Sequence, residues 1–434
     1  MYAAPVAGPP GLRAPQAQGR PDPEGTRKII GAVLYALGMI GGGLLLLLVF
    51  IIPALFSKDT SGELHAMFIG AVFALPALVV YLWIPWIVDR YDPEPWYCLL
   101  LALSWGAVAA CGFSAVINTA VHIGGDAALG KGFGDVLGAC VSAPIVEEFF
   151  KGLAVFGMFF FMRRQFDGVV DGVIYATFSA LGFAAVENII YYSNAAHEGS
   201  NVLIGTIVVR GILGPWGHPL YTSMTGLGFG IARETNKTWL KWLAPLGGYI
   251  FAAFLHSTWN TAATLSNTLV LLMLPLWFLF VIAFFGLVIW LVKRKGKIIR
   301  DHLRDEVLMG NLTPWELELI TSPVGRIKAT FSYGGRAGRK FIDAAARLAL
   351  SKWHTGRATQ GRKLTVSADM ILPLRQDLFR LRNEVSKALG KQVEQPRPWT
   401  PPQMQAPPGT QPSAQGYGGY QPGAPAPGGP QYRR

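Results

Sequence analysis

The sequence has few charged residues, few cysteines and none of the short signatures of the common hydrolases. Only 15% of its 434 residues are charged and 51% are hydrophobic, which departs in both respects from an ordinary soluble domain. Because Cys98, Cys111 and Cys140 fall in or beside apolar segments at no metal-binding spacing, we interpret them as buried side chains rather than a disulfide framework. The usual serine-hydrolase motif GxSxG and the zincin motif HExxH are both missing.

Long apolar runs recur instead from about Ile29 to Val292, and they predict a polytopic membrane protein. The first run is too long for the apolar part of a signal peptide and lacks a cleavage pattern, so we predict a true span. The expected fold class is all-α, a membrane helix bundle of about eight spans. They cover approximately residues 29–56, 66–88, 97–121, 135–162, 170–194, 215–233, 242–264 and 269–292. The apolar segment 201–213 is short and carries Arg210, which favours an interfacial or re-entrant piece over a further crossing.

The basic residues predict the orientation of these spans. They gather in the loops on one side of the predicted membrane. By the positive-inside rule, this side and both termini are expected in the cytoplasm, and the protein is expected in the plasma membrane. The basic residues on that side are Arg20, Arg27, Lys28, Arg163, Arg164, Arg233, Lys237, Lys241, Lys293, Arg294, Lys295 and Lys297, against Lys58, Lys131 and Arg210 in the opposite loops.

The regions outside the spans differ in composition. Residues 1–28 and 392–434 are rich in proline and glycine, so we predict a disordered tail at each end. Residues 293–391 are basic: from Arg294 to Lys391 there are 20 Lys and Arg against 9 Asp and Glu, most of the chain's net charge of +12. Without a zinc-finger or RNA-binding signature, we expect this helical region to lie beside an anionic inner leaflet and expect no nucleic-acid partner. Helical periodicity is present in WELELI (315–320), KFIDAAARLAL (340–350) and DLFRLRNEV (377–385).

A small set of ionisable side chains falls within the predicted spans, where a charge is costly and therefore favours a functional role. At a rise of about 1.5 Å per residue, Glu147, Glu187, His218 and His256 share a band in the external half of the bilayer, from about 3 to about 12 residues below the external helix ends. The set is Glu147, Glu148 and Lys151 in the fourth span, Glu187 in the fifth, His218 in the sixth and His256 in the seventh, with Asn260 one turn after His256.

Carboxylates and imidazoles at one level favour a hydrolytic site. Such groups activate water and protonate leaving amines, and a histidine or asparagine can donate a hydrogen bond to a developing oxyanion. Structural alternatives exist for each group. Glu147 and Glu148 can form a buried salt bridge with Lys151. Glu187, and the pair His256 and Asn260, can form hydrogen bonds between helices, and His218 can be an interfacial histidine at a helix start.

Five stretches resemble motifs of the PrsW family of intramembrane proteases. The resemblance covers approximately residues 65–292, and four of the stretches contain the polar residues named above. The stretches are VEEFFKG (146–152), similar to the EExxK motif, GFAAVEN (182–188), similar to FxxxE, GHPLYTSMTGLGFG (217–230), FLHSTWN (254–260) and the acidic loop DRYDPEPW (89–96).

The resemblance implies an endopeptidase related to the type II CAAX prenyl proteases and bacteriocin-immunity proteins, which use a glutamate-activated water. It makes Glu147 or Glu148 the base, places Glu187 where CAAX enzymes carry histidine, and aligns His256 and Asn260 with an HxxxN motif. His218 lies in the family's histidine helix. A metal is not demanded, but zinc is compatible with ligands drawn from Glu148, Glu187, His218 and His256.

The family resemblance also implies a substrate class: membrane-anchored proteins such as anti-sigma factors, first cut on the external side, in a bacterial cell membrane. Two other functions fit buried acids and histidines. A proton-coupled transporter or channel would use them as a relay, although no internal repeat is evident. A non-catalytic membrane scaffold would instead recruit partners through its basic tail.

Overall fold

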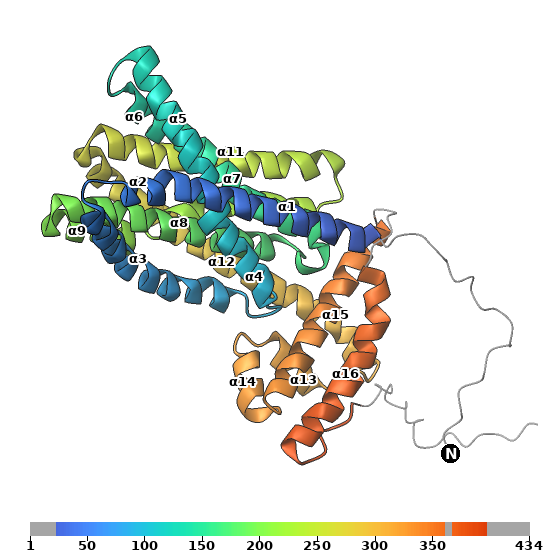
Figure 1. The fold of residues 1–434 in the computed structure, drawn as a ribbon. Helices are drawn as coiled ribbons and strands as arrows, with labels where there is room; N and C mark the ends of the chain where they lie inside the picture. The colour runs from blue at the N-terminus through green and yellow to red at the C-terminus, as the bar shows by residue number, and fades with distance from the viewer. Residues whose placement is uncertain (1–22, 361–366, 397–434) are drawn as a thin grey trace, which may run out of the picture.

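The computed structural model of the protein describes residues 23–360 and 367–396, and this part of the chain is helical without a strand. The predicted all-α class is therefore confirmed. Long helices run side by side in a bundle, and the last helices form a second group at one end of it (Figure 1). The bundle contains α1 (Pro23–Leu46), η1 (Leu47–Ile51), α2 (Ile52–Leu55), α3 (Thr60–Val88), α4 (Trp96–Ser104), η2 (Trp105–Ala110), α5 (Cys111–Leu129), α6 (Phe133–Leu137), η3 (Gly138–Ser142), α7 (Ala143–Phe161), η4 (Arg163–Gln165), α8 (Val169–Glu198), α9 (Ser200–Thr206), η5 (Ile207–Leu213), α10 (Gly217–Glu234), α11 (Thr238–Leu265) and α12 (Asn267–Leu308).

Each of the eight predicted spans coincides with a helix or a run of consecutive helices. Within the described part of the chain, five are long and apolar enough to cross a membrane: 25–55, 60–88, 96–129, 169–198 and 268–308. The other three are the runs formed by α6, η3 and α7, by α10, and by α11, which carry most of the polar residues singled out above. The segment 201–213 folds as two short helices, α9 and η5.

Helix α8 lies at the centre of the bundle. In its most apolar window 94% of the residues are buried, whereas the other four candidate spans have between 6% and 39% buried. It packs against α3, α4, η2, α7 and α10. A helix surrounded by other helices can carry polar side chains that face protein rather than lipid.

Glycines let the helices around α8 approach closely. A Cβ atom on Gly172 of α8 would lie 2.2 Å from the carbonyl oxygen of Gly226 on α10, and one on Gly226 would lie 2.2 Å from that of Gly172. On α11, a Cβ at Gly248 would lie 2.3 Å from the carbonyl oxygen of Met224. Small residues at such crossings allow backbones to touch, so α8, α10 and α11 form one tightly packed layer.

The C-terminal helices follow and pack against the end of α12, which extends beyond the rest of the bundle. Helix α12 continues without a break to Leu308, so the boundary expected after Val292 falls inside one helix. Helices were predicted around 315–320, 340–350 and 377–385, and α13, α15 and α16 confirm them; a helix at 325–332 was missed. The C-terminal helices are α13 (Pro314–Thr321), α14 (Gly325–Ser332), α15 (Arg336–Gln360) and α16 (Ser367–Leu389).

The predicted tails can be compared only in part. Residues 1–22 and 397–434 lie outside the described residues, whereas residues 23–28, expected in the N-terminal tail, belong to α1. This prediction was wrong because Pro23 is tolerated in a first helical turn, where its missing N–H would have no partner.

The loop between α3 and α4 joins the bundle to the C-terminal helices. Tyr91 inserts between them: its ring lies so close to α12 that a Cβ on Gly296 would be 2.8 Å from it. The Tyr91 hydroxyl donates to the carbonyl oxygen of Thr321, at the end of α13, over 3.4 Å. Arg347 of α15 reaches Asp92 of the same loop, with its Nε 3.5 Å from Oδ1. These contacts tie two C-terminal helices, α13 and α15, to the loop at one end of the bundle and pack the loop against the extension of α12.

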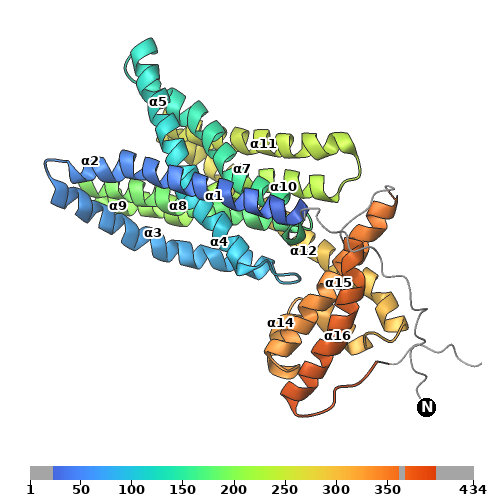
Figure 2. The same cartoon turned by 45° about the vertical axis from the view of Figure 1, so that its right-hand side comes forward.

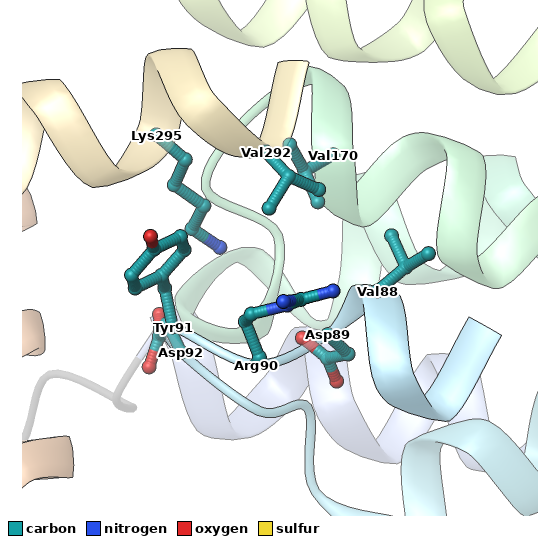
Figure 3. Close-up of a pocket in the computed structure, with 8 residues that line it drawn as sticks. All are labelled: Val88, Asp89, Arg90, Tyr91, Asp92, Val170, Val292 and Lys295. Atoms are coloured by element: carbon teal, nitrogen blue, oxygen red, sulfur yellow. The ribbon is translucent and has the colours of Figure 1, made fainter. Parts of the chain in front are cut away.

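The same loop carries buried carboxyl groups around a small pocket. Figure 3 shows the pocket between the loop and Lys295, with Asp89 and Asp92 in its lining. Lys295 Nζ lies 2.9 Å from Asp171 Oδ1, and the hydroxyl of a tyrosine on α8 donates to Glu94. Asp89 Oδ2 accepts from the backbone N–H of Glu94 at 2.6 Å, whereas Oδ1 has no hydrogen-bond partner among the described residues.

Burial makes this junction sensitive to pH. It raises the pKa of Asp89 to about 8 and that of Asp92 to about 6, against the lowering effect of the Lys295 charge. The folded protein therefore holds protons that the unfolded chain releases above its ordinary aspartate pKa of about 4. Because the folded state binds more protons in this window, the free energy of unfolding falls as pH rises, by about 1.4 kcal/mol per pH unit for each such group below its folded pKa.

We expect the melting temperature of the purified protein to fall between about pH 6 and about pH 8. Asp89→Asn, which keeps an oxygen for the Glu94 N–H, should melt higher than the wild type at pH 8 and show a smaller fall. Thermal unfolding in detergent at several pH values measures both slopes. Equal slopes for the two proteins would show that Asp89 is not protonated in the folded state.

Candidate active site

The polar residues of the bundle meet where α7, α8, α10 and α11 adjoin. Glu147, Glu148 and Lys151 are on α7, Glu187 is on α8, and the two histidines are on α10 and α11. Glu187 lies past the middle of α8, on the half away from the C-terminal helices, and His256 has a similar position on α11. The cluster is therefore nearer the end of the bundle opposite the C-terminal helices.

Glu148 is fully buried and both of its oxygens are engaged. Oε1 lies 2.6 Å from Lys151 Nζ and 3.1 Å from His256 Nδ1, and Oε2 accepts from the Thr222 hydroxyl at 2.7 Å. A carboxylate held by three helices in this way is a poor candidate for a mobile proton acceptor. It fixes the orientation of His256, because an Nδ1–H donated to Glu148 leaves Nε2 as the free ring nitrogen.

Glu147, in contrast to Glu148, has one carboxylate oxygen without a hydrogen-bond partner among the described residues. Oε1 accepts from Asn118 Nδ2 at 3.3 Å, and the Asn118 Oδ1 in turn accepts from a serine of η3. Oε2 is buried and has no hydrogen-bond partner among the described residues. It lies 3.8 Å from Lys151 Nζ and 3.9 Å from His256 Nε2. A buried polar atom without a partner is costly and marks a place for a water, an ion or a substrate.

Glu187 and His218 form the other half of the cluster. His218 Nε2 lies 2.8 Å from Glu187 Oε2, and the same oxygen accepts from Arg210 Nη2 at 2.5 Å. Arg210 also donates from Nε to Asn188 Oδ1 at 2.8 Å and covers the ring of Tyr191, 3.8 Å from its centroid. The segment that carries Arg210 is thus anchored on α8 by a cation that stabilises the Glu187 carboxylate.

Lys151 connects the two halves. Its Nζ, already bonded to Glu148, lies 3.0 Å from His218 Nδ1 and 4.4 Å from the ring centroid of Phe183. The rings of His218 and His256 are 5.0 Å apart, edge to face. Glu147, Glu148, Glu187, His218 and His256 therefore share one cluster, although they come from distant parts of the sequence.

Asn260 has a different environment from the one its motif suggests. Its Nδ2 donates to the carbonyl oxygen of Ala139 in η3 at 3.0 Å, and Ser257 donates to that of Cys140 at 2.5 Å. Both bonds tie α11 to the start of the α7 segment. This is the helix-joining role that remained an alternative for Asn260, and its catalytic role stays a prediction.

Sequence reasoning did not assign Arg210, Asn118 or Thr222 to the site. Arg210 had a usable signal, since an arginine in an apolar segment needs a buried acceptor and Glu187 was the unpaired acid. Asn118 and Thr222 had none, because uncharged polar residues are common in membrane helices. Thr222 lies one turn after His218 on α10 yet contacts Glu148 rather than Glu187, which only the packing of α7 against α10 decides.

The cluster has the donors for a metal ion. Glu147, His218 and His256 each offer a ligand atom, and these atoms lie within 4.8 Å of one another. Two histidines and one glutamate match the ligands of many catalytic zinc sites, and each imidazole also contacts a second carboxylate, as metal-bound histidines commonly do. The Lys151 ammonium, close to Glu147 and His218, would compete with such an ion.

A membrane bundle with a buried cluster of acids and imidazoles is typical of an intramembrane hydrolase, and the comparisons with known proteins agree. Residues 94–291 match the family described as "PrsW family intramembrane metalloprotease". The chain is similar to proteins named Protease PrsW. The one from Halalkalibacterium halodurans is 30% identical over 166 residues, 38% of this chain and 69% of that one. The one from Geobacillus kaustophilus is 27% identical over 179 residues, which are 39% of this chain and 68% of that one. The one from Bacillus subtilis is 26% identical over 216 residues, which are 49% of this chain and 87% of that one.

The chain belongs to the PrsW family of intramembrane proteases. It is a protease rather than a transporter or a scaffold, and its apolar helices and bacterial relatives make it a bacterial membrane protein. The family match begins at residue 94, later than the resemblance expected from residue 65, and most of the DRYDPEPW loop precedes it. The C-terminal helices α13 to α16 follow it. No solved structure matches the chain.

Proposed function

We propose that this protease hydrolyses a peptide bond of a membrane-anchored protein with a water activated by Glu147. One observation carries the assignment: Glu147 Oε2 is the buried carboxylate oxygen of the cluster that has no hydrogen-bond partner among the described residues. A water bonded there would lose its proton to Oε2 as it attacks the scissile carbonyl. The proton then passes to the leaving amine, as in general acid–base catalysis.

The other residues of the cluster prepare this step. Glu148 orients His256, whose free Nε2 lies 3.9 Å from Glu147 Oε2 and can accept a hydrogen bond from the attacking water. Glu187, held by Arg210, orients His218 through its Nε2, and the Nδ1 of His218 faces Lys151. The Lys151 ammonium provides a fixed positive charge beside the reacting atoms, which favours the oxyanion that develops on the carbonyl.

The family's description as a metalloprotease adds a second way to activate the water. Glu147, His218 and His256 would hold the ion, and when bound it would act as a Lewis acid on the water or carbonyl. Both descriptions need the same three side chains. They differ in metal content, which can be measured directly.

The metal description predicts about one zinc ion per purified wild-type chain and far less in the His256→Ala variant, because a ligand set of three tolerates no loss, whereas the carboxylate description predicts cleavage without bound zinc. Elemental analysis after dialysis against zinc and then buffer gives the ratio. A wild-type protein without bound zinc that still cleaves its substrate would contradict the metal site and leave the carboxylate as the activating group.

Charge and depth support cleavage near the external face. The loops at the end with the C-terminal helices carry most of the basic residues, which favours a cytoplasmic location for that end and for both termini. The cluster lies nearer the other end. A single-span substrate, such as a membrane-anchored anti-sigma factor, would then be cut close to its external domain.

Substrates can be identified by comparing bacteria that carry the wild-type protein with bacteria that carry Glu148→Gln. We expect ectodomain fragments of one or a few membrane proteins in the medium of the first strain and a strong reduction in the second, because Glu148 orients His256. Quantitative proteomics of the medium and the membranes measures both. An unchanged set of fragments, with equal amounts of the two proteins in the membrane, would contradict the proposed activity.

A further inference from the structure

Helix α14 presents an apolar face to its surroundings. Val324, Ile327 and Phe331 are 44%, 62% and 85% exposed, and their spacing of three and four residues puts them on one side of the helix. The opposite side is packed: Ala329 is fully buried, and a Cβ on Gly325 would lie 1.9 Å from the carbonyl oxygen of Leu319. Tight packing on one side holds the apolar face outward.

The attachment of α14 places it at the membrane boundary of the bundle. Thr321, four residues before α14, accepts the hydroxyl of Tyr91 in the loop between α3 and α4. Trp86 and Trp96, five residues to either side of Tyr91, are 61% and 75% exposed, and exposed tryptophans at helix ends mark the interface between lipid and water. In both views of the fold α14 lies on the side of the C-terminal helices that faces the bundle (Figures 1 and 2).

Exposed basic side chains lie on α14 itself and on the start of the helix that follows it. Lys328 is exposed on α14 between Ile327 and Phe331, and Arg336 and Lys340 are exposed on the first turns of α15. Arg326 is directed away from the face, since it pairs with Asp343 of α15. An apolar strip with neighbouring cations is the composition of a helix that lies in the headgroup layer of an anionic bilayer.

The support of α14 is rigid. Helix α12 runs from the bundle to Leu308 as one helix, and Ile299 and Leu303 on its extension are fully buried against the C-terminal helices. Arg300 of the extension donates to the Thr321 hydroxyl at 3.1 Å. Because the bundle fixes its own depth in the membrane, this connection fixes the depth of α14 as well.

We propose that α14 lies in the headgroup layer of the adjoining leaflet, with Val324, Ile327 and Phe331 among the acyl chains and Lys328, Arg336 and Lys340 on anionic lipid phosphates. The partner is the bilayer itself. The C-terminal helices are thereby held against the membrane surface at two places, through α12 and through α14.

The test uses the full-length protein in vesicles of phosphatidylcholine and phosphatidylglycerol. Cys98, Cys111 and Cys140 are buried, so the thiol of Phe331→Cys can be labelled selectively with an environment-sensitive fluorophore, with the unsubstituted protein as the blank. Phe379→Cys, on the exposed side of α16 (46% exposed), is the matched control. We expect blue-shifted emission at 331 and about two-fold stronger quenching by lipids spin-labelled near the headgroup than at 379. Ile327→Cys should behave like Phe331→Cys and covers a failure of that variant to fold.

Adding Lys328→Glu to Phe331→Cys should reduce the quenching in vesicles with phosphatidylglycerol and leave it unchanged in phosphatidylcholine alone. Water-like emission at 327 and 331 in both kinds of vesicle, equal to that at 379, would overturn the proposal. Water-like emission in vesicles combined with protection in native membranes would also overturn it, and would assign the face to a protein.

Discussion

Replacing Glu147 with glutamine is expected to lower peptide-bond cleavage by about 10²- to 10⁴-fold, the usual contribution of a general base. Glutamine keeps the size of the side chain and an oxygen for the Asn118 amide, which bonds Glu147 Oε1 in the wild type. It removes the negative charge at Oε2, the atom that faces His256 and Lys151 without a hydrogen bond of its own. The variant should therefore fold normally and fail at the chemical step.

The measurement is the rate of cleavage of a confirmed substrate in proteoliposomes, together with the melting temperature of each protein. Glu63→Gln is the matched control, because Glu63 forms a half-exposed ion pair with His197, away from the cluster. Glu148→Gln should lower both cleavage and stability, since it leaves the fully buried Lys151 without its shortest ion pair. If Glu147→Gln cleaves at more than about a tenth of the wild-type rate, Glu147 is not the base.

A substitution of Gly248 by leucine is expected to abolish both folding and cleavage. Even the first carbon of a side chain would lie 2.3 Å from the carbonyl oxygen of Met224, which belongs to a helix backbone and cannot rotate away. Helix α11 would have to move from α10, and it carries His256 two turns further on. Overpacking of this kind costs about 1–3 kcal/mol or more, and here it also displaces α11, whose His256 contacts Glu148 of α7.

The adjacent Gly247 provides the control. A Cβ there meets no atom within 4 Å, and the residue is exposed on the outer face of α11, so Gly247→Leu should accumulate in the membrane and cleave like the wild type. Both variants add the same side chain to the same helix, and only its direction differs. Fluorescence-detected size exclusion measures the folded fraction, and equal folded fractions for the two variants would contradict the close contact between α10 and α11.

The acids and imidazoles were identifiable in the sequence because the bilayer makes them conspicuous. A glutamate, lysine or histidine in an apolar run has a large cost, so few are present and nearly all of them have a role. This reasoning found the five residues that cluster, and Lys151 with them. It failed for Asn118 and Thr222, whose burial costs little and whose presence in a helix carries no signal, and Asn260 was expected at the cluster because it follows His256 by one helical turn and matches the HxxxN motif.

In the C-terminal region, sequence patterns predicted most of the helices but missed one of them and misplaced a boundary. Helical periodicity predicted α13, α15 and α16, but α14 was missed although its apolar residues recur at helical spacing, because eight residues are too short a window for that periodicity to be decisive. The boundary after Val292 was set by composition, which changes from apolar to basic there. The α12 backbone continues through that point because no proline or glycine pair stands near Val292; the internal proline of α12, Pro275, lies well before it.

The sequence by itself determined the helical membrane class, the family and the residue types of the site, because hydrophobic length and charge cost are local properties of a chain. Tertiary structure decided which glutamate is engaged and which has a free oxygen, that Arg210 stabilises Glu187, and that Tyr91 ties the bundle to the C-terminal helices. Those facts depend on distances between helices far apart in the sequence. The glycine contacts that set these distances are visible only once the helices have neighbours.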